Sequence, residues 1–338
     1  MYVKRTYSFW MTLTWSFKGL LIGLSIATVA VLIYQCLGWK WVQIPWLPMG
    51  LIGTALAFYI GFKNNASYDR SWEARKIWGA IVNNSRSFAA MALSYVSKLQ
   101  PEHTVSESEL SNCKRELVYR HLAWLTALRF QMHRPREWEH DSKWFREHYH
   151  LNNLSQTPEE LNQELAALLP AKELQAIQGV ANKATQILRL QTEALARLRS
   201  SNLLDNLRHM ELQRLISALY DEQGKSERIK SFPFPRQYAS TGINLIKLFS
   251  FVLPFGLLKI FDDMGPQLVW LTIPFSALVN WVFVLMEMIG DFSENPFEGS
   301  YNDVPILSIS RTIEIDLREM LQETNVPGPI VPVQGFLV

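Results

Sequence analysis

The sequence has little with which to build a disulfide framework, because its 338 residues include only two cysteines, Cys36 and Cys113. Cys36 lies in an apolar run and Cys113 in a polar one, so both are interpreted as free thiols. The sequence also lacks an excess of charge of one sign, since its 33 lysines and arginines nearly balance its 31 aspartates and glutamates. This balance gives no indication of a nucleic-acid partner or an acidic substrate.

Motifs for catalysis are missing as well. The chain has no glycine-rich phosphate loop, no serine or cysteine nucleophile elbow and no histidine–carboxylate set at helical spacing, and no internal repeat of fixed period. These absences predict a protein that is not an enzyme.

A histidine-rich stretch at residues 133–150 raises the possibility of a metal site. It contains four histidines and four carboxylates, which are His133, His140, His148, His150, Glu137, Glu139, Asp141 and Glu147. Their spacings match no standard site. A solvated connecting loop is the favoured interpretation, and no metal is expected.

What the sequence has in abundance is long apolar runs and tryptophan. Hydrophobic residues make up 48% of the chain, and there are twelve tryptophans. Four runs are long enough to cross a bilayer, which takes about 20 apolar residues; they cover residues 20–37, 44–62, 243–260 and 268–289. No small-residue cleavage site follows the first run, so a retained membrane helix is favoured over a signal peptide.

The basic residues around the first pair of runs predict its orientation. Lysines and arginines precede the pair and follow it, whereas only Lys40 lies between the two runs. The positive-inside rule then places both ends of this pair in the cytoplasm, and four spans in total keep both termini of the multi-pass chain there. Lys247 interrupts the third run. Because a charge at mid-bilayer costs about 3 kcal/mol, we expect it near the inner interface or against protein.

Between the two pairs of runs the pattern is helical. Leucines recur at three- and four-residue intervals, for example within residues 113–132 and 181–222, and no β alternation competes with this period. SQTPEE predicts a helix start at Thr157 and Pro158. The fold class is therefore an all-α membrane protein with four transmembrane helices in two hairpins and a helical cytosolic region. Its predicted parts are residues 1–62, 63–237, 238–290 and 291–338.

The second run carries two adjacent rows of residues four apart, which share a helix face. Gly53, Ala57 and Gly61 form a small-residue row that allows close helix approach. Thr54, Phe58 and Phe62 form the other row. Ordinary helix packing is the plain interpretation of the two aromatics, whereas copies arranged around an axis would place them on its lining. Thr54 is either a polar mouth to that lining or a hydroxyl bonded to its own helix.

Three passages give the chain a resemblance to a known family. GFKNNASYDRSWEARKIWG follows the second run, SERIKSFPFPRQY precedes the third, and ENPFEGSYNDVPI follows the fourth. In this order and with these separations they resemble the bestrophins, specifically their bacterial homologues. The resemblance covers nearly the whole chain, and residues 133–160 match least.

The resemblance implies a homopentameric ion channel with one central pore. By position relative to the FKNN-type motif, its narrow neck falls on Thr54, Phe58 and Phe62. A lower constriction falls near Leu203 or Leu204. The residues after the neck are either an inner mouth or a hydrogen-bonded network between subunits, and the network is favoured for most of them: Lys63, Asn64, Tyr68, Asp69, Arg70 and Glu73. Lys63 and Asn64 stay candidates for contact with permeating ions.

Animal members of the family bind Ca²⁺ at an acidic cluster just after the NPF motif. Here residues 298–303 carry too few carboxylates for a strong hard-cation site, so no cofactor is expected. At the outer tip, Asp262 and Asp263 are either an acidic ring at the pore entrance or a polar turn. The tail from Asn325 contains too many prolines to form a helix, and we expect it to wrap another surface.

The predicted function is passive conduction of monovalent ions, with chloride or other small anions favoured by the family. A sodium-type cation channel of the same architecture is the alternative, because a neck of uncharged side chains carries no fixed charge. A different alternative is a membrane-anchored helical scaffold or sensor, which has no need of the two rows on the second run. The expected partners are further copies of the chain, the lipid bilayer and the permeant ions, without nucleic acid.

Overall fold

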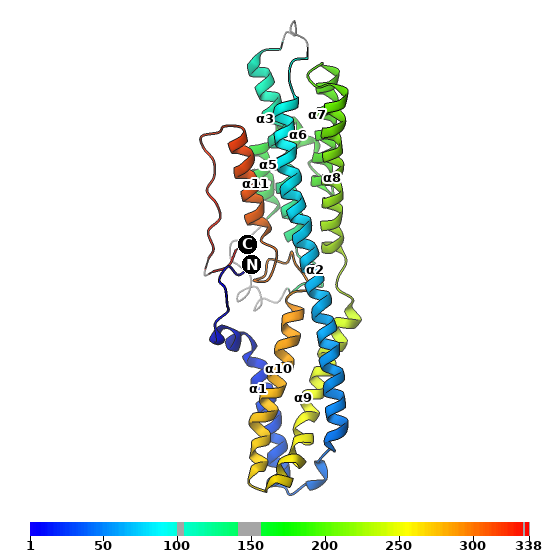
Figure 1. The fold of residues 1–338 in the computed structure, drawn as a ribbon, viewed down its shortest axis with the longest axis vertical. Coiled ribbons are helices and arrows are strands. Elements are labelled where there is room, and N and C mark those ends of the chain that lie inside the picture. Colours follow the sequence, from blue (N-terminus) through cyan, green and yellow to red (C-terminus); the bar gives the residue numbers. More distant parts are fainter. Residues whose placement is uncertain (100–104, 141–156, 334, 338) are drawn as a thin grey trace. The chain divides into compact units, whose positions relative to one another are not determined.

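The computed structural model describes residues 1–99, 105–140, 157–333 and 335–337, and this part of the chain is α-helical without a β-strand. The helices are α1 (Phe9–Gln35), α2 (Trp46–Tyr95), α3 (Glu107–His133), α5 (Pro158–Leu168), α6 (Ala171–Ala176), α7 (Lys183–Ser200), α8 (Asn206–Ser231), α9 (Arg236–Met264), α10 (Thr272–Asp291) and α11 (Ile306–Met320). Two 3-10 turns, η1 (Lys40–Val42) and η2 (Leu268–Leu271), complete the set (Figure 1).

The chain divides into two compact units. The membrane unit consists of residues 4–71 and 233–294, and the polar unit of residues 1–3, 72–232 and 295–338. The division falls inside α2, which continues for 50 residues without a break. At 1.5 Å per residue α2 is about 75 Å long, more than twice the hydrocarbon thickness of a bilayer. The sequence prediction that the second span runs on as a helix is therefore confirmed.

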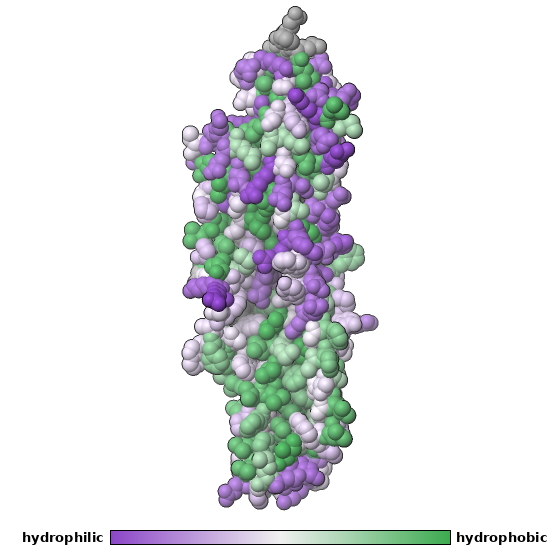
Figure 2. All heavy atoms as spheres, viewed as in Figure 1, coloured by the Kyte–Doolittle hydropathy of each residue, from purple (hydrophilic) through white to green (hydrophobic). Residues whose placement is uncertain are grey.

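Four helical segments among the described residues are long and apolar enough to cross a membrane. They lie in Phe9–Gln35, Lys40–Tyr95, Asn206–Met264 and Leu268–Asp291. Figure 2 shows apolar side chains gathered over the helices of the membrane unit, and polar side chains over much of the polar unit. The four predicted spans are thus present as helices.

Within the membrane unit, α1 packs closely on α10 because small residues face the contact. A Cβ added at Gly19 would lie 2.6 Å from a Val284 methyl, and one added at Gly23 would lie 2.7 Å from Nδ2 of Asn280. That Asn280 amide donates to the Gly19 carbonyl (2.7 Å). Close approach and interhelical hydrogen bonds are the means by which helices associate in lipid.

The polar unit has a large apolar core centred on α3. Trp124 is fully buried, and its indole N–H donates to Oε1 of Gln223 on α8 (2.9 Å). Arg120 is also buried and is satisfied by a bidentate pair with Glu173 at 2.7 Å for both bonds. Such a fully paired guanidinium is tolerated in a core, whereas an unpaired one is not.

Several local predictions can be compared with the helices. Thr157 caps α5 in a capping box with Glu160, as predicted. The long pattern over residues 181–222 is divided at residues 201–205, where Asp205 caps α8 through the Arg208 N–H (3.0 Å). Lys247 is exposed in the single chain, so it does not lie against protein of its own chain.

The C-terminal tail is not helical and returns to the polar unit's own surface. Val3 N–H donates to the Gly335 carbonyl (2.9 Å), and Leu337 N–H donates to the Met1 carbonyl (2.8 Å). Phe336 is buried there. The tail therefore wraps a surface of its own chain, the first residues included.

Candidate functional site

The row predicted from the sequence lies on an uncovered face of α2. Phe58 is 66% exposed and Phe62 is 70% exposed in the single chain, and Thr54 is exposed as well. The Thr54 hydroxyl donates to the Gly50 carbonyl at 2.9 Å, so it is bonded to its own helix. That bond leaves the row with no unpaired polar group, and its open surface is mostly aromatic.

The opposite face of α2 packs on the rest of the membrane unit. Met49, Leu56 and Ile60 are buried in one apolar cluster with residues of α9. At 100° per residue, these positions lie about half a turn from the row of Thr54, Phe58 and Phe62. A Cβ at Gly53 would lie 3.2 Å from the Phe249 ring, so the first member of the small-residue row faces α9 of the same chain.

Lys63 and Asn64 are engaged within the chain, which does not agree with their candidacy for contact with ions. Lys63 is 0% exposed, and its ammonium pairs with Glu287 on α10. Asn64 donates to the Met286 carbonyl at 2.8 Å. Because both side chains end on α10, they tie α2 to α10 at this level of the membrane unit, and Lys63 has no surface at a pore mouth.

The remaining members of the predicted mouth or network divide between surface and ion pair. Tyr68 and Asp69 are exposed, and Arg70 is half-buried. Glu73, in the polar unit, pairs with Arg228 on α8. The Glu73 pair therefore joins α2 and α8 of one chain.

The positions predicted for the lower constriction are buried inside the polar unit. Leu203 is 3% exposed and Leu204 is 1% exposed, and both belong to its core. A residue that lines a constriction must present its side chain to open space, so this burial disagrees with the prediction. Three residues further along, Leu207 in the first turn of α8 is 77% exposed. The Asp205 N-cap, which starts α8 and sets this register, was the signal in the sequence.

The two aspartates that were predicted to lie at the outer tip, Asp262 and Asp263, have different environments. Asp262 lies in the last turn of α9, where its Oδ2 accepts a hydrogen bond from the Tyr34 hydroxyl at 2.7 Å, and Asp263 is exposed. Asp262 is thus used in packing α1 against α9.

The histidine-rich stretch is described only in part. His148 and His150 lie outside the described residues, and His140 contacts Glu298. Within residues 1–99, 105–140, 157–333 and 335–337, no group of three histidine, cysteine or acidic side chains is arranged to hold a metal ion.

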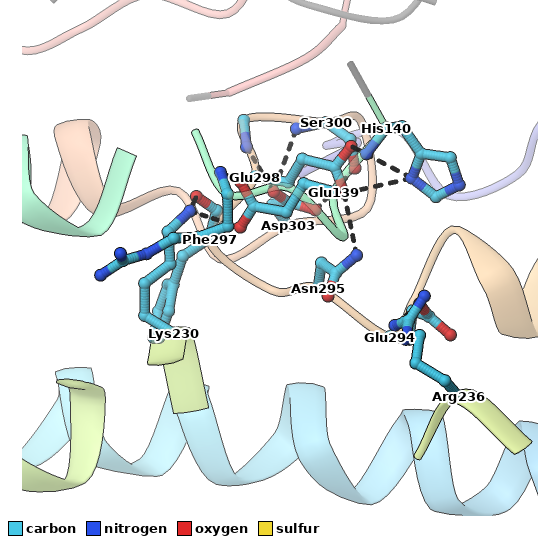
Figure 3. Close-up of polar contacts among 12 residues, drawn as sticks. Glu139, His140, Lys230, Arg236, Glu294, Asn295, Phe297, Glu298, Ser300 and Asp303 are labelled. Carbon is cyan, nitrogen blue, oxygen red and sulfur yellow. Dashed lines mark hydrogen bonds and ion pairs between the residues drawn. The ribbon is translucent and has the colours of Figure 1, made fainter. Parts of the chain in front are cut away.

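A second polar site lies in residues 295–304, which we call the junction loop (Figure 3). Beside this loop, Lys230 of α8 pairs with Glu139, and the Lys230 Nζ lies 3.4 Å from the Phe297 carbonyl oxygen. Glu298 accepts the His140 backbone N–H at 2.8 Å. Burial is the main cause that raises the pKa of Glu139, against the opposing effect of Lys230. The sequence pattern placed Glu139 only in the histidine-rich stretch and gave no indication of Lys230, because each lies more than sixty residues from the loop along the chain.

Glu294, the last residue of the membrane unit, is buried and pairs with Arg236 at 2.8 Å. Burial raises the pKa of this carboxyl, and Asp291 adds to the effect. Both residues lie in the passages SERIKSFPFPRQY and ENPFEGSYNDVPI, so the pair joins two of the three motifs.

These features define a polytopic α-helical membrane protein, with four spans, a helical polar unit and uncovered aromatic side chains on an apolar helix. Residues 16–319 match the family model described as Bacterial/Fungal Bestrophin protein, and the chain belongs to this family. It is 27% identical to a voltage-dependent anion channel-forming protein of Ralstonia nicotianae, over 99% of both chains. It is 28% identical to a protein of the same description from Escherichia coli, over 86% of this chain and 81% of that protein.

Solved structures share the fold. A bacterial bestrophin homologue from Klebsiella pneumoniae superposes with a TM-score of 0.74 at 22% sequence identity, over 91% of this chain and 99% of that one. At this identity the likeness shows the fold alone. The predicted family and fold class are thereby confirmed.

Proposed function

We propose that the chain is one subunit of a homopentameric channel that passes small monovalent anions, such as chloride, down their gradient. In this arrangement α2 of each copy faces a common axis, and the channel lies in the inner membrane with both termini in the cytoplasm. Membership of the bestrophin family and the anion-channel descriptions of the relatives support the proposal.

The observation that carries it is the uncovered row on α2. Phe58 and Phe62 are exposed on the face opposite the helix's packed side. Copies of α2 around an axis would turn this row inward as stacked uncharged rings, and such a hydrophobic constriction controls ion flow by how readily it is wetted. The rings carry no fixed charge, so the choice of anions over cations rests on the relatives.

Leu207 replaces Leu203 and Leu204 in our proposal for the lower constriction. It is the exposed apolar side chain at the start of α8, whereas the two predicted leucines fill the core. An apolar ring at the tip of a helix is a second place at which wetting can limit flow.

Reversal potentials test the function directly. The full chain is reconstituted in planar bilayers with asymmetric NaCl, and each ion is then replaced in turn by a large impermeant one. An anion channel gives a reversal potential near that of chloride and loses its current when chloride is replaced. A reversal potential near that of sodium would instead establish the cation alternative, and no current under any condition would favour the scaffold.

Truncation of the neck aromatics is the matching mutational prediction. Phe58→Ala and Phe62→Ala widen the neck and remove apolar surface that resists wetting, so single-channel conductance should rise severalfold. Phe251→Ala is the matched control, because Phe251 is an exposed aromatic on α9 of the same unit. Conductance and gating unchanged in both neck variants would remove these residues from the pore lining.

A further inference from the structure

The chain crosses between the two units four times, after Val3, Ser71, Phe232 and Glu294. Within the polar unit, the segments next to these crossings all reach the junction loop. From α2, the Trp78 ring lies 6.4 Å from the ring of Phe297. From the end of α8, Lys230 reaches the carbonyl of the same residue.

The terminal segment reaches the loop through aromatic rings. Phe336 stacks on Tyr301 with 4.1 Å between centroids, and it also lies 4.9 Å from Tyr2. The loop itself begins at Asn295, directly after the fourth crossing. A change in this loop therefore acts on every chain segment that leads into the membrane unit.

The loop surrounds buried charged groups in which negative charges outnumber positive ones. Its described core contains the carboxylates of Glu139, Glu298 and Asp303 and the ammonium of Lys230, all of them buried or nearly so. An isolated buried charge is costly, and one ammonium compensates one carboxylate fully. His140, 3.1 Å from Glu298, adds a second cation only when it is protonated, and a proton bound by one of the carboxyl groups reduces the excess without it.

Asp303 has the geometry to accept that proton (Figure 3). Its Oδ2 accepts the N–H groups of Gly299 (2.6 Å) and Ser300 (3.0 Å). Its Oδ1 accepts the Ser300 hydroxyl, at 2.6 Å. A hydroxyl can donate or accept, so a proton on Oδ1 would reverse this bond and leave the two bonds to Oδ2 intact.

The electrostatic surroundings favour the proton near neutral pH. Burial, and next the charge of Glu298, raise the pKa of Asp303 to about 7, although its three hydrogen-bond donors oppose the shift. Burial also lowers the pKa of the Met1 amine to about 6. The charged and titratable groups of the cluster are Glu298 and Tyr301 on the loop, Lys230 on α8, Glu139 and His140 before α5, Arg75 on α2 and the Met1 amine.

We propose that Asp303 is a proton-binding site that makes the junction loop sensitive to pH. Protonated Asp303 closes the loop with all its bonds made. Deprotonation places a second negative charge beside Glu298 and loosens the loop from α8 and the terminal segment. The last step rests on the proposed function: the loosened loop alters the opening of the channel.

Hydrogen exchange of the full chain in detergent tests the proton site without any need for current. After correction for intrinsic rates, the wild-type amides of residues 295–304 should exchange faster at pH 8 than at pH 6. Asp303→Asn imitates the protonated form, because its amide can donate to the Ser300 hydroxyl, and should lose the difference. Asp221→Asn, an exposed change on α8, should keep it. A pH difference retained in Asp303→Asn, or absent from the wild type, would overturn the proposal.

A second variant separates proton binding from a purely structural role. Glu298→Gln removes the neighbouring charge that raises the pKa of Asp303. Its loss should move the midpoint of the exchange transition to lower pH. An unchanged midpoint in a folded Glu298→Gln variant would contradict the assignment to Asp303.

Current recorded at pH 6 and pH 8 on the cytoplasmic side then tests the coupling. Wild type and Asp221→Asn should differ between the two pH values, and Asp303→Asn should not. An exchange transition without a matching change in current would overturn the coupling and keep the proton site. Absence of any current would count against the proposed channel, and the exchange experiment would still decide the proton site.

Discussion

Phe58 and Lys63 lie five residues apart on one helix and have opposite environments. Phe58 is open to the surroundings, and Lys63 is sealed against α10 by its pair with Glu287. Five residues turn a helix by about 140°, which is enough to move from the free side of α2 to its packed side. At this scale the identity of a residue says less about its role than the direction in which its helix turns it.

His121 shows the same dependence inside the polar unit. Its ring is buried between Phe88 (5.2 Å) and Trp124 (5.1 Å), and neither of its nitrogens has a hydrogen-bond partner. Burial lowers its pKa to about 3. The folded state thus holds His121 neutral at pH values where the unfolded chain would protonate it.

We expect His121→Phe to stabilise the chain, by about 1–3 kcal/mol, since an unpaired buried polar group is removed. Between pH 6.5 and 3 the unfolded wild type binds a proton that the folded form rejects, so wild-type stability falls as pH is lowered. The gain from His121→Phe should therefore grow below pH 6.5. Thermal unfolding at pH 7 and pH 5 measures it. His121→Gln keeps a polar group and should show no gain at pH 7, but it should share the increase at pH 5, because it also lacks the titrating ring.

Among the elements, α1 and α10 pack closely through small residues that the sequence pattern did not indicate. The small-residue row predicted from the sequence lies on α2, yet Gly19 and Gly23 of α1 also lie nearly in contact with a neighbouring helix. Only the packing partner distinguishes these glycines from Gly61, whose added Cβ would meet nothing within 4 Å.

Gly23→Ala should destabilise the membrane unit by about 1–3 kcal/mol, the usual cost of overpacking. Its Cβ would displace the Asn280 amide and break the bond from that amide to the Gly19 carbonyl. Thermal unfolding in detergent is the measurement. Gly50→Ala is the control, because its Cβ would lie 3.7 Å from the nearest atom of Trp46, an ordinary contact. Equal stability of the two variants would mean that the α1–α10 contact is loose.

For the whole molecule, the proposed assembly makes the uncovered surfaces of a single chain meaningful. Leu207 at the start of α8 and the aromatic row of α2 are both apolar and both exposed. Exposed apolar residues are ordinary when scattered, so exposure alone identifies no interface. A direct measure of neighbouring copies is needed.

Oxidative cross-linking supplies that measure. In a background with Cys36→Ser and Cys113→Ser, Leu207→Cys should form disulfide-linked pairs of chains, because five copies would bring this side chain to one axis. Leu204→Cys, buried in the core, should stay uncross-linked. Native mass spectrometry should give five times the chain mass. A different multiple would refute the pentamer, and cross-links at Leu204 alone would restore the original position of the constriction.

Sequence by itself was sufficient for the fold class and the family. Long apolar runs predict membrane helices because bare backbone in lipid must be hydrogen-bonded within its own segment, and leucine periodicity predicts the helices between them. The row of Thr54, Phe58 and Phe62 also follows from spacing alone, since residues four apart share a face whatever lies beside them.

Tertiary structure alone decided which faces are covered. Periodicity shows that residues share a side of a helix but not whether another helix lies against that side. Leu203 and Leu204 were therefore expected to line a constriction and are buried, and Lys63, a candidate for contact with ions, is buried as well. Likewise Asp303 and Lys230 lie 73 positions apart, and only folding places them in one cluster. Burial and charge proximity depend on contacts between distant segments, which is why the junction loop became visible only in three dimensions.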